Sequence, residues 1–195
     1  MNLLPKLTLD FVEKEIRELI DKEPRFTKQF TTWLYSTDYF SAPASANGHN
    51  NIIGGLALHS YNVYQRLNEI NIKMEFKIPF DSVLILGLLH DICKISFYKT
   101  EKRNRKNSET KRWEEYDAFV ISDKLPLDHG HKSVILLRQL KLNIQEMLAI
   151  AWHLGAWDTH EYARTICLRE AMKTTPWVLA LQWADQMAMF YDEEQ

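Results

Sequence analysis

The chain has few of the features that mark disulfide-rich, membrane-spanning or nucleic-acid-coating proteins. It contains only two cysteines, Cys93 and Cys167, and neither belongs to a C-x-x-C unit. A disulfide framework and a thiolate zinc site are therefore disfavoured, and a reducing, cytoplasmic setting is expected. The formal net charge of −2 gives no global field that would favour nucleic acid or an anionic membrane. No apolar run reaches the length of a membrane span.

The remaining composition is that of a compact globular domain. Of 195 residues, 46% are hydrophobic and 12% are aromatic, which is enough for one sizeable core, so residues 1–195 are expected to form a single domain. In "LTLDFVEKEIRELI" apolar residues recur at helical spacing and charges fill the other face, which favours an amphipathic helix over a secretory leader. Helices are expected over 8–38 and again over most of 56–191.

Local signals place the ends of several elements. Thr8 can cap the first helix, Asp81 can cap an apolar helix, and Asn143 with Glu146 has the spacing of a capping box. The helical spacing of apolar residues ends over about 95–122, where "ISFYKTEKRNRK" and "KRWEEYDAFVIS" flank "NSET". This pattern predicts an inserted hairpin or flap in an otherwise all-α fold.

The stretch "ILGLLHDICK" places His90 and Asp91 directly after a run of apolar residues at the end of an expected helix. Burying an imidazole and a carboxylate is costly unless a partner satisfies them. A single buried histidine is more often a hydrogen-bonded core residue than a ligand. A divalent metal, however, would satisfy several such groups from different helices at once. Four further residues have comparable apolar, helical surroundings: His59, His129, His153 and Asp185.

The order of these residues resembles that of the HD superfamily of metal-dependent phosphohydrolases. The segments "GGLALHS", "LLHDICK" and "WADQM" supply His59, then His90 and Asp91, then Asp185. The resemblance spans about 43–191 and implies an HD-type helical bundle. It further implies that these four side chains bind one divalent ion and that Asp91 is able to bridge to a second.

Some members of that family have two more histidines between the His-Asp pair and the last aspartate. His129 and His153 occupy that order here, so the resemblance assigns them to a second ion, against the alternative of buried structural histidines. His131 and His160 are expected at the surface. For His49, in the loop before His59, a solvated position is expected over the alternative that it lines the mouth of the pocket.

Lys94 completes an H-D-x-x-K pattern that recurs in the family, where the lysine helps to hold a phosphate. An ammonium close to a metal-bound carboxylate can balance a phosphoryl oxygen, although a surface lysine at a helix end is the alternative. Cys93 stands where many relatives have glycine and is expected to pack without touching the metal. Because no thiolate ligand is expected, the sequence does not choose among Mn, Fe, Mg, Co and Ni, and either one or two ions would bind. Asp91 and Lys94 are the expected catalytic residues.

The segment "KTEKRNRKNSETKR" is strongly basic. Such a run is usually a solvated loop, but it begins soon after Lys94, so a flap here is expected to reach the metal centre. Arg103, Arg105 and Lys106 would then hold a polyphosphate or a nucleic-acid backbone.

Aromatic residues add weaker signals. Trp113 and Tyr116 would stack a base or pack within the hairpin. Trp157 and Asp158 are a further candidate rim pair. Three other tryptophans are expected in the core: Trp152, Trp177 and Trp183.

The expected function is divalent-metal-dependent hydrolysis of a phosphate mono- or diester, with a nucleotide as the leading substrate and no membrane partner. Three alternatives remain open. "APASANGHNNIIGGLALHS" resembles the approach to the metal site in HD-type 3′–5′ exoribonucleases, which makes single-stranded nucleic acid an alternative partner. The six-ligand order is also that of HD-type di-iron oxygenases. A non-catalytic nucleotide sensor with a structural metal would need the same residues.

Overall fold

The computed structural model describes residues 4, 6–155 and 162–193, most of which are helical. The helices are α1 (Leu9–Lys22), α2 (Lys28–Tyr35), α3 (Gly55–Lys73), α4 (Phe80–Leu89), α5 (His129–Leu136), α6 (Ile144–Ala151), α7 (Tyr162–Thr174) and α8 (Trp177–Met187). Short helical turns are η1 (Ile92–Lys94), η2 (Arg138–Leu140) and the π-helical η4 (Ala188–Asp192). Strands β1 (Tyr98–Lys106) and β2 (Trp113–Ile121) pair antiparallel. The predicted hairpin is thus present, and the all-α class holds apart from this two-stranded sheet.

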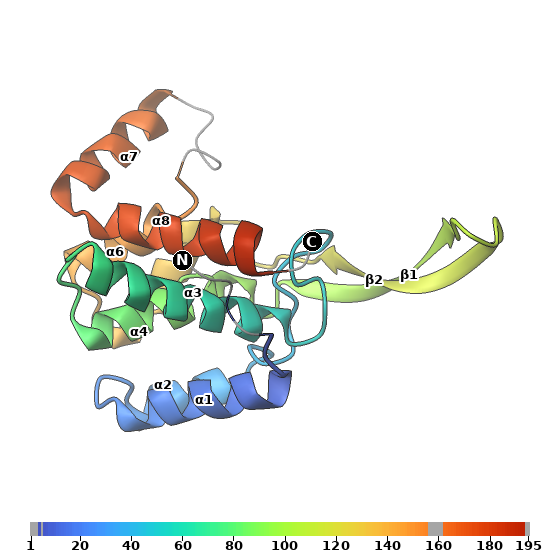
Figure 1. Ribbon diagram of the computed structural model, residues 1–195, viewed down its shortest axis with the longest axis horizontal. Coiled ribbons are helices and arrows are strands. Elements are labelled where there is room, and N and C mark those ends of the chain that lie inside the picture. The colour runs from blue at the N-terminus through green and yellow to red at the C-terminus, as the bar shows by residue number, and fades with distance from the viewer. Residues whose placement is uncertain (1–3, 5, 156–161, 194–195) are drawn as a thin grey trace.

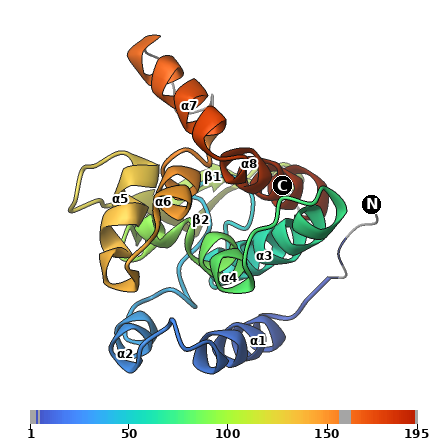
Figure 2. The same cartoon turned by 90° about the vertical axis from the view of Figure 1, so that its left-hand side faces the viewer.

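Helices α3, α4 and α8 form the centre of the bundle (Figure 1). Helix α3 packs against both α4 and α8, while α5 and α6 lie together beside α8 (Figure 2). Helices α1 and α2 cover the opposite side, α7 projects from the body, and the hairpin extends away from it. None of the described helices is both long and apolar enough to span a membrane.

The sequence of α4 explains its central position. Every residue from Ser82 to Leu89 is buried, as expected of a helix that is apolar on all sides. At Gly87 the helix comes so close to α3 that a Cβ atom would lie 2.5 Å from Cα of Tyr64. Only glycine permits this approach, which brings the end of α4 against the middle of α3.

The capping predictions were correct at two of three positions. Thr8 accepts a hydrogen bond from the backbone of Phe11, and Asn143 with Glu146 forms the predicted capping box. The prediction for Asp81 was wrong, because α4 already begins at Phe80. Asp81 lies in the first turn of α4 and accepts from a tertiary partner instead.

A buried ion pair ties the N-terminal helices to the bundle. Arg25, between α1 and α2, donates to the two oxygens of Glu146 at 2.5 and 2.6 Å, and to Asp81 at 3.0 Å. The hydroxyl of Ser82 donates to the same Glu146 carboxylate at 2.7 Å. Because Glu146 is fully buried, its charge depends on these donors.

Replacing Arg25 by Ala should therefore lower the free energy of unfolding by about 3 kcal/mol, since Glu146 would be left buried without its cation. Urea denaturation followed by circular dichroism measures the change. Lys22→Ala is the control, because its ion pair with Glu18 is exposed and its loss should leave the midpoint almost unchanged. Equal midpoints for the two variants would contradict the assigned role of Arg25.

Candidate metal centre

The structure brings six predicted ligands together from five parts of the bundle. They come from the second turn of α3, the end of α4, the start of α5, the segment just after α6 and the last turn of α8. In that order the residues are His59, His90 with Asp91, His129, His153 and Asp185. All are buried except His129, whose side chain is 22% exposed.

The carboxylate of Asp91 lies between two pairs of histidines. Its Oδ2 atom is 3.7 Å from Nε2 of both His59 and His90. Its Oδ1 atom is 3.3 Å from Nε2 of His153 and contacts Nε2 of His129. Each oxygen therefore faces a different pair of imidazoles, which divides the cluster into two halves that share Asp91.

Asp185 completes one of these halves. Its Oδ1 atom lies 3.1 Å from Nε2 of His59 and 3.8 Å from Nε2 of His90. We call His59, His90, Asp91 and Asp185 the first half. The second half consists of Asp91 with the two remaining histidines, His129 and His153.

The hydrogen bonds of His90 and His153 indicate whether their imidazoles are available to bind a metal. The Nδ1 atoms of His90 and His153 lie 3.1 and 2.7 Å from the carbonyl oxygens of Gly87 and Ile150. Because a carbonyl only accepts, each Nδ1 carries a proton, and in the neutral imidazole Nε2 then presents a lone pair. Both Nε2 atoms are buried and have no hydrogen-bond partner among the described residues. Buried lone pairs oriented by outer hydrogen bonds suit metal ligation.

The electrostatics of the cluster also favour a cation. Burial lowers the pKa of His90 to about 3, so this imidazole is neutral near pH 7. Burial acts in the same direction on His59, but Glu193 and Asp185 outweigh it and raise the pKa to about 10. Burial opposes ionisation of Asp185, yet its hydrogen bond with His59 holds the pKa below the usual range. Ionised carboxylates thus face neutral or readily charged imidazoles, and a divalent ion would balance them.

Glu193 contacts the cluster in a way that the sequence did not reveal. Its carboxylate lies 3.0 Å from Nδ1 of His59, accepts from Asn62 at 3.2 Å, and is 1% exposed. One residue earlier, Asp192 binds the buried Arg66. The π-helical turn after α8 directs both acids back onto α3. The spacing of His59, Asn62 and Arg66 along one helix face was the only signal for this contact.

Lys94 and Cys93 adjoin the cluster at different atoms: Lys94 contacts the Asp91 oxygen that faces the first half, and Cys93 contacts His129 of the second half. The Nζ atom of Lys94 lies 2.6 Å from Oδ2 of Asp91, and its side chain is 12% exposed. Cys93 is buried, and its Sγ lies 3.3 Å from Nδ1 of His129. A cavity of about 110 Å³ opens beside them. Its lining residues are Cys93, Lys94, Phe97, Asp123, Leu127, His129 and Lys132.

The remaining predicted histidines differ in their surroundings. His49 is half-buried, with its ring centroid 4.9 Å from that of His59, so the expectation of a solvated residue was wrong. Its Nε2 atom is buried and has no partner in the part of the chain that the structure describes. His131 is exposed, as predicted, and pairs with Asp128. Three predicted positions lie outside the described residues: Trp157, Asp158 and His160.

The structure does not bring the basic residues of the hairpin to the metal cluster. Arg103, Arg105 and Lys106 are exposed on β1, and the hairpin extends away from the helical body (Figure 1). Arg105 is bound by Glu114 at 2.7 Å and lies over the ring of Tyr116. The expected flap over the centre is therefore not observed, because the nine paired positions of β1 and β2 form an extended ribbon.

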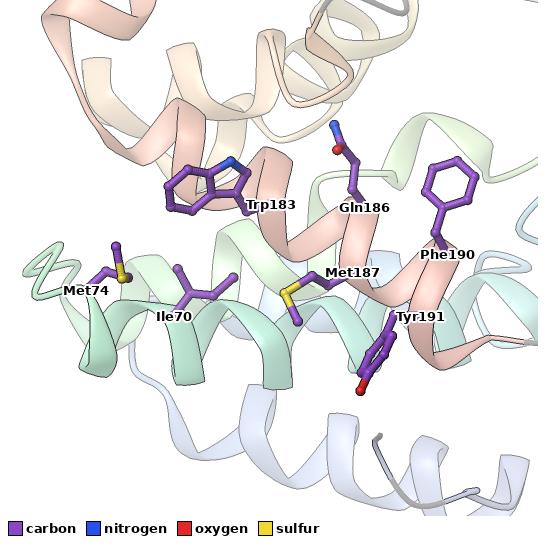
Figure 3. Close-up of a pocket in the computed structure, with 7 residues that line it drawn as sticks. All are labelled: Ile70, Met74, Trp183, Gln186, Met187, Phe190 and Tyr191. Atoms are coloured by element: carbon purple, nitrogen blue, oxygen red, sulfur yellow. The ribbon is translucent and has the colours of Figure 1, made fainter. Parts of the chain in front are cut away.

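A groove of about 720 Å³ lies apart from the six ligands, between α3 and the end of α8 (Figure 3). Trp183 lines it and is 39% exposed, so its predicted place in the core was wrong. Trp152 and Trp177 are buried as predicted. The other lining residues are Ile70, Met74, Gln186, Met187, Phe190 and Tyr191.

Comparison with family models identifies the class of protein. The HD domain model matches residues 56–189, which is more than half of the chain. The chain therefore belongs to the HD-domain family, whose members are generally metal-dependent hydrolases of the phosphohydrolase type. No curated protein and no solved structure gave a significant match. The matched segment includes all six predicted ligands and ends before Glu193.

Removal of the Glu193 carboxylate should weaken metal binding. Glu193→Ala is expected to lower affinity by about 10–100-fold, because Nδ1 of His59 loses the partner that orients its ring. Glu193→Gln should lose less, since its amide oxygen still accepts. Competition with a chromogenic chelator measures the affinity, with the exposed Glu170→Ala as control. Unchanged affinity in a folded Glu193→Ala variant would mean that His59 is oriented without this residue.

Proposed function

We propose that the protein is a divalent-metal-dependent phosphohydrolase that acts on a nucleotide or a related phosphate mono- or diester. The observation that carries this proposal is the placement of Asp91 between two pairs of histidines, each facing one of its oxygens. The unpartnered Nε2 atoms of His90 and His153 support it. Membership of the HD-domain family supports the same class of reaction.

The two halves of the cluster would each hold one ion. The first half offers two imidazoles and two carboxylates, and the second half offers two further imidazoles and shares Asp91. A divalent ion bound there would polarise a phosphoryl oxygen and lower the pKa of water. The carboxylate of Asp91 would keep the two halves in a fixed relation, because each of its oxygens belongs to one of them.

Lys94 would supply positive charge to the substrate. Burial disfavours its ammonium form, but the neighbouring Asp91 carboxylate outweighs this and holds the pKa of Lys94 above its usual value. The group therefore stays charged at neutral pH. An ammonium held in a largely buried position stabilises charge on a phosphoryl oxygen more strongly than one in water.

The cavity beside Cys93 and Lys94 suggests how a substrate would approach. Its volume of about 110 Å³ leaves room for a phosphoryl group. Two ammonium groups border it, Lys94 and Lys132, and Asp123 binds the second of these at 2.5 Å. We infer that the phosphoryl group enters here while the rest of the substrate stays outside.

A nuclease activity on single-stranded nucleic acid is the second candidate. The hairpin carries exposed Arg103 and Lys106 on β1, and Trp113 at the start of β2 is 72% exposed. Exposed cations beside an exposed indole suit a phosphate backbone and a stacked base. Binding that weakens steeply with salt would favour this substrate.

The proposal predicts about two ions per chain and release of phosphate or nucleotide in the presence of Mn²⁺. Asp91→Ala should abolish both metal retention and turnover, because it removes the carboxylate that both halves share. Plasma mass spectrometry of untagged protein gives the metal content, and a panel of nucleotide mono- and diesters gives the activity. Asp10→Ala, an exposed acid on α1, is the control.

Other outcomes of this experiment point elsewhere. Full activity of the Asp91→Ala variant would overturn the proposal. Two irons, oxygen consumption and no hydrolysis would identify an oxygenase. A nucleotide that stays bound and intact during long incubation with metal would identify a sensor.

Lys94→Met should lower kcat by about 10²–10³-fold, since it removes one preorganised donor to the phosphoryl group. The metal content should stay close to that of the unsubstituted protein, because Lys94 contributes no ligand atom. Steady-state kinetics on the best substrate of the panel measures the effect. Lys99→Met, on the exposed hairpin, is the matched control. A kcat unchanged in Lys94→Met would remove Lys94 from the reaction.

A further inference from the structure

Cys93 has surroundings unlike those of a packed small residue. It lies in the turn η1 and is 3% exposed. Its Sγ atom is 3.3 Å from Nδ1 and 3.5 Å from Nε2 of His129. A hydrogen bond in line with one ring nitrogen would leave the other much farther away. The near-equal distances therefore place the sulfur over the face of the imidazole ring, without a well-directed bond to either nitrogen.

The sulfur belongs to a larger group of donors. Donor atoms of Cys93, Asp91 and His129 all lie within 4.8 Å of one another. On the other side of Oδ1 of Asp91, at 3.3 Å, lies the buried Nε2 of His153, which has no hydrogen-bond partner among the described residues. The rings of His129 and His153 are 5.1 Å apart between centroids. The sulfur, the His129 imidazole and the Asp91 carboxylate thus border one small volume, and the His153 imidazole faces the same carboxylate oxygen.

The backbone holds Cys93 in this position. Its N–H donates to Oγ of Ser133, which is fully buried on α5, at 3.2 Å. That bond ties η1 to the helix that begins with His129. The cavity of about 110 Å³ reaches both Cys93 and His129 and gives an ion a path from solvent.

We propose that Cys93 is a thiolate ligand of the second ion, together with Asp91, His129 and His153. This inference rests on the second metal of the proposed function. As the ion binds, a sulfur–metal bond forms and the thiol proton leaves to solvent, with no transfer of electrons. A sulfur, two nitrogens and one oxygen suit a thiophilic ion such as Zn²⁺, Fe²⁺ or Co²⁺, whereas Mg²⁺ prefers oxygen ligands.

The test is the absorption spectrum of untagged protein loaded with Co²⁺. Wild type should show a thiolate-to-cobalt charge-transfer band in the near ultraviolet, and Cys93→Ser should lose it while still binding cobalt in the first half. In Cys93→Ser the affinity of the second half for Zn²⁺ should fall by more than about 100-fold, since loss of a residue that only orients a ligand already costs about 10–100-fold. Cys167→Ala is the matched control, because Cys167 is exposed on α7. That variant should keep the band.

The outcomes separate this inference from the proposed function. Two cobalt ions per chain without the band would overturn the thiolate ligand and leave the phosphohydrolase proposal standing. A band that persists in Cys93→Ser would also overturn it. If wild type takes up no transition metal, the proposed function fails and this inference fails with it. If Cys93→Ser does not fold, the Cys167→Ala variant still tests the inference, because Cys93 is its sole thiol. A charge-transfer band in that variant assigns the sulfur ligand to Cys93, and the absence of the band overturns the assignment.

Discussion

The carboxylate of Asp91 is buried, since only 3% of the surface of this residue is exposed. A buried charge of this kind is tolerated only when compensating groups surround it. Here four imidazoles and one ammonium do so, and their residues come from α3, α4, α5, η1 and the segment just after α6. The bundle must therefore bring five chain segments to one point. The close approach of α3 and α4 at Gly87 follows from this demand, since a larger residue would separate His59 from His90.

The ends of elements were predictable where the determining contacts are local. The hairpin over 95–122 and the capping box at Asn143 depend on residues a few positions apart, and both were correct. The order of histidines and aspartates likewise located the cluster, because each falls in its own apolar segment. Asp81 was mistaken for a cap because its carboxylate is held by Arg25, whose position depends on tertiary packing. Nothing in the local pattern distinguishes these two uses of an aspartate.

Long-range contacts account for what the sequence did not show. Glu193 reaches His59 only because a π-helical turn follows α8, and a π-helical turn has no clear sequence signature. Trp183 lies in a largely apolar segment of the sequence, yet one face of α8 lines an open groove. The thiol of Cys93 was expected to pack, and its distance to His129 becomes visible only once α5 is docked on η1. In each case the partner lies on another element, so the local pattern alone does not identify it.

The direction of the hairpin limits how the proposed hydrolase would recognise its substrate. A flap closed over the cluster would enclose the leaving group, but the paired strands extend away from the helical body (Figure 1). On the proposed function, recognition near the metals would depend on a cavity of about 110 Å³ bordered by Lys94 and Lys132. Such a site would select for phosphate and would discriminate little between the groups attached to it. Specificity for a base or a chain would have to come from residues farther out, and Trp113 on the hairpin offers an exposed surface of that kind.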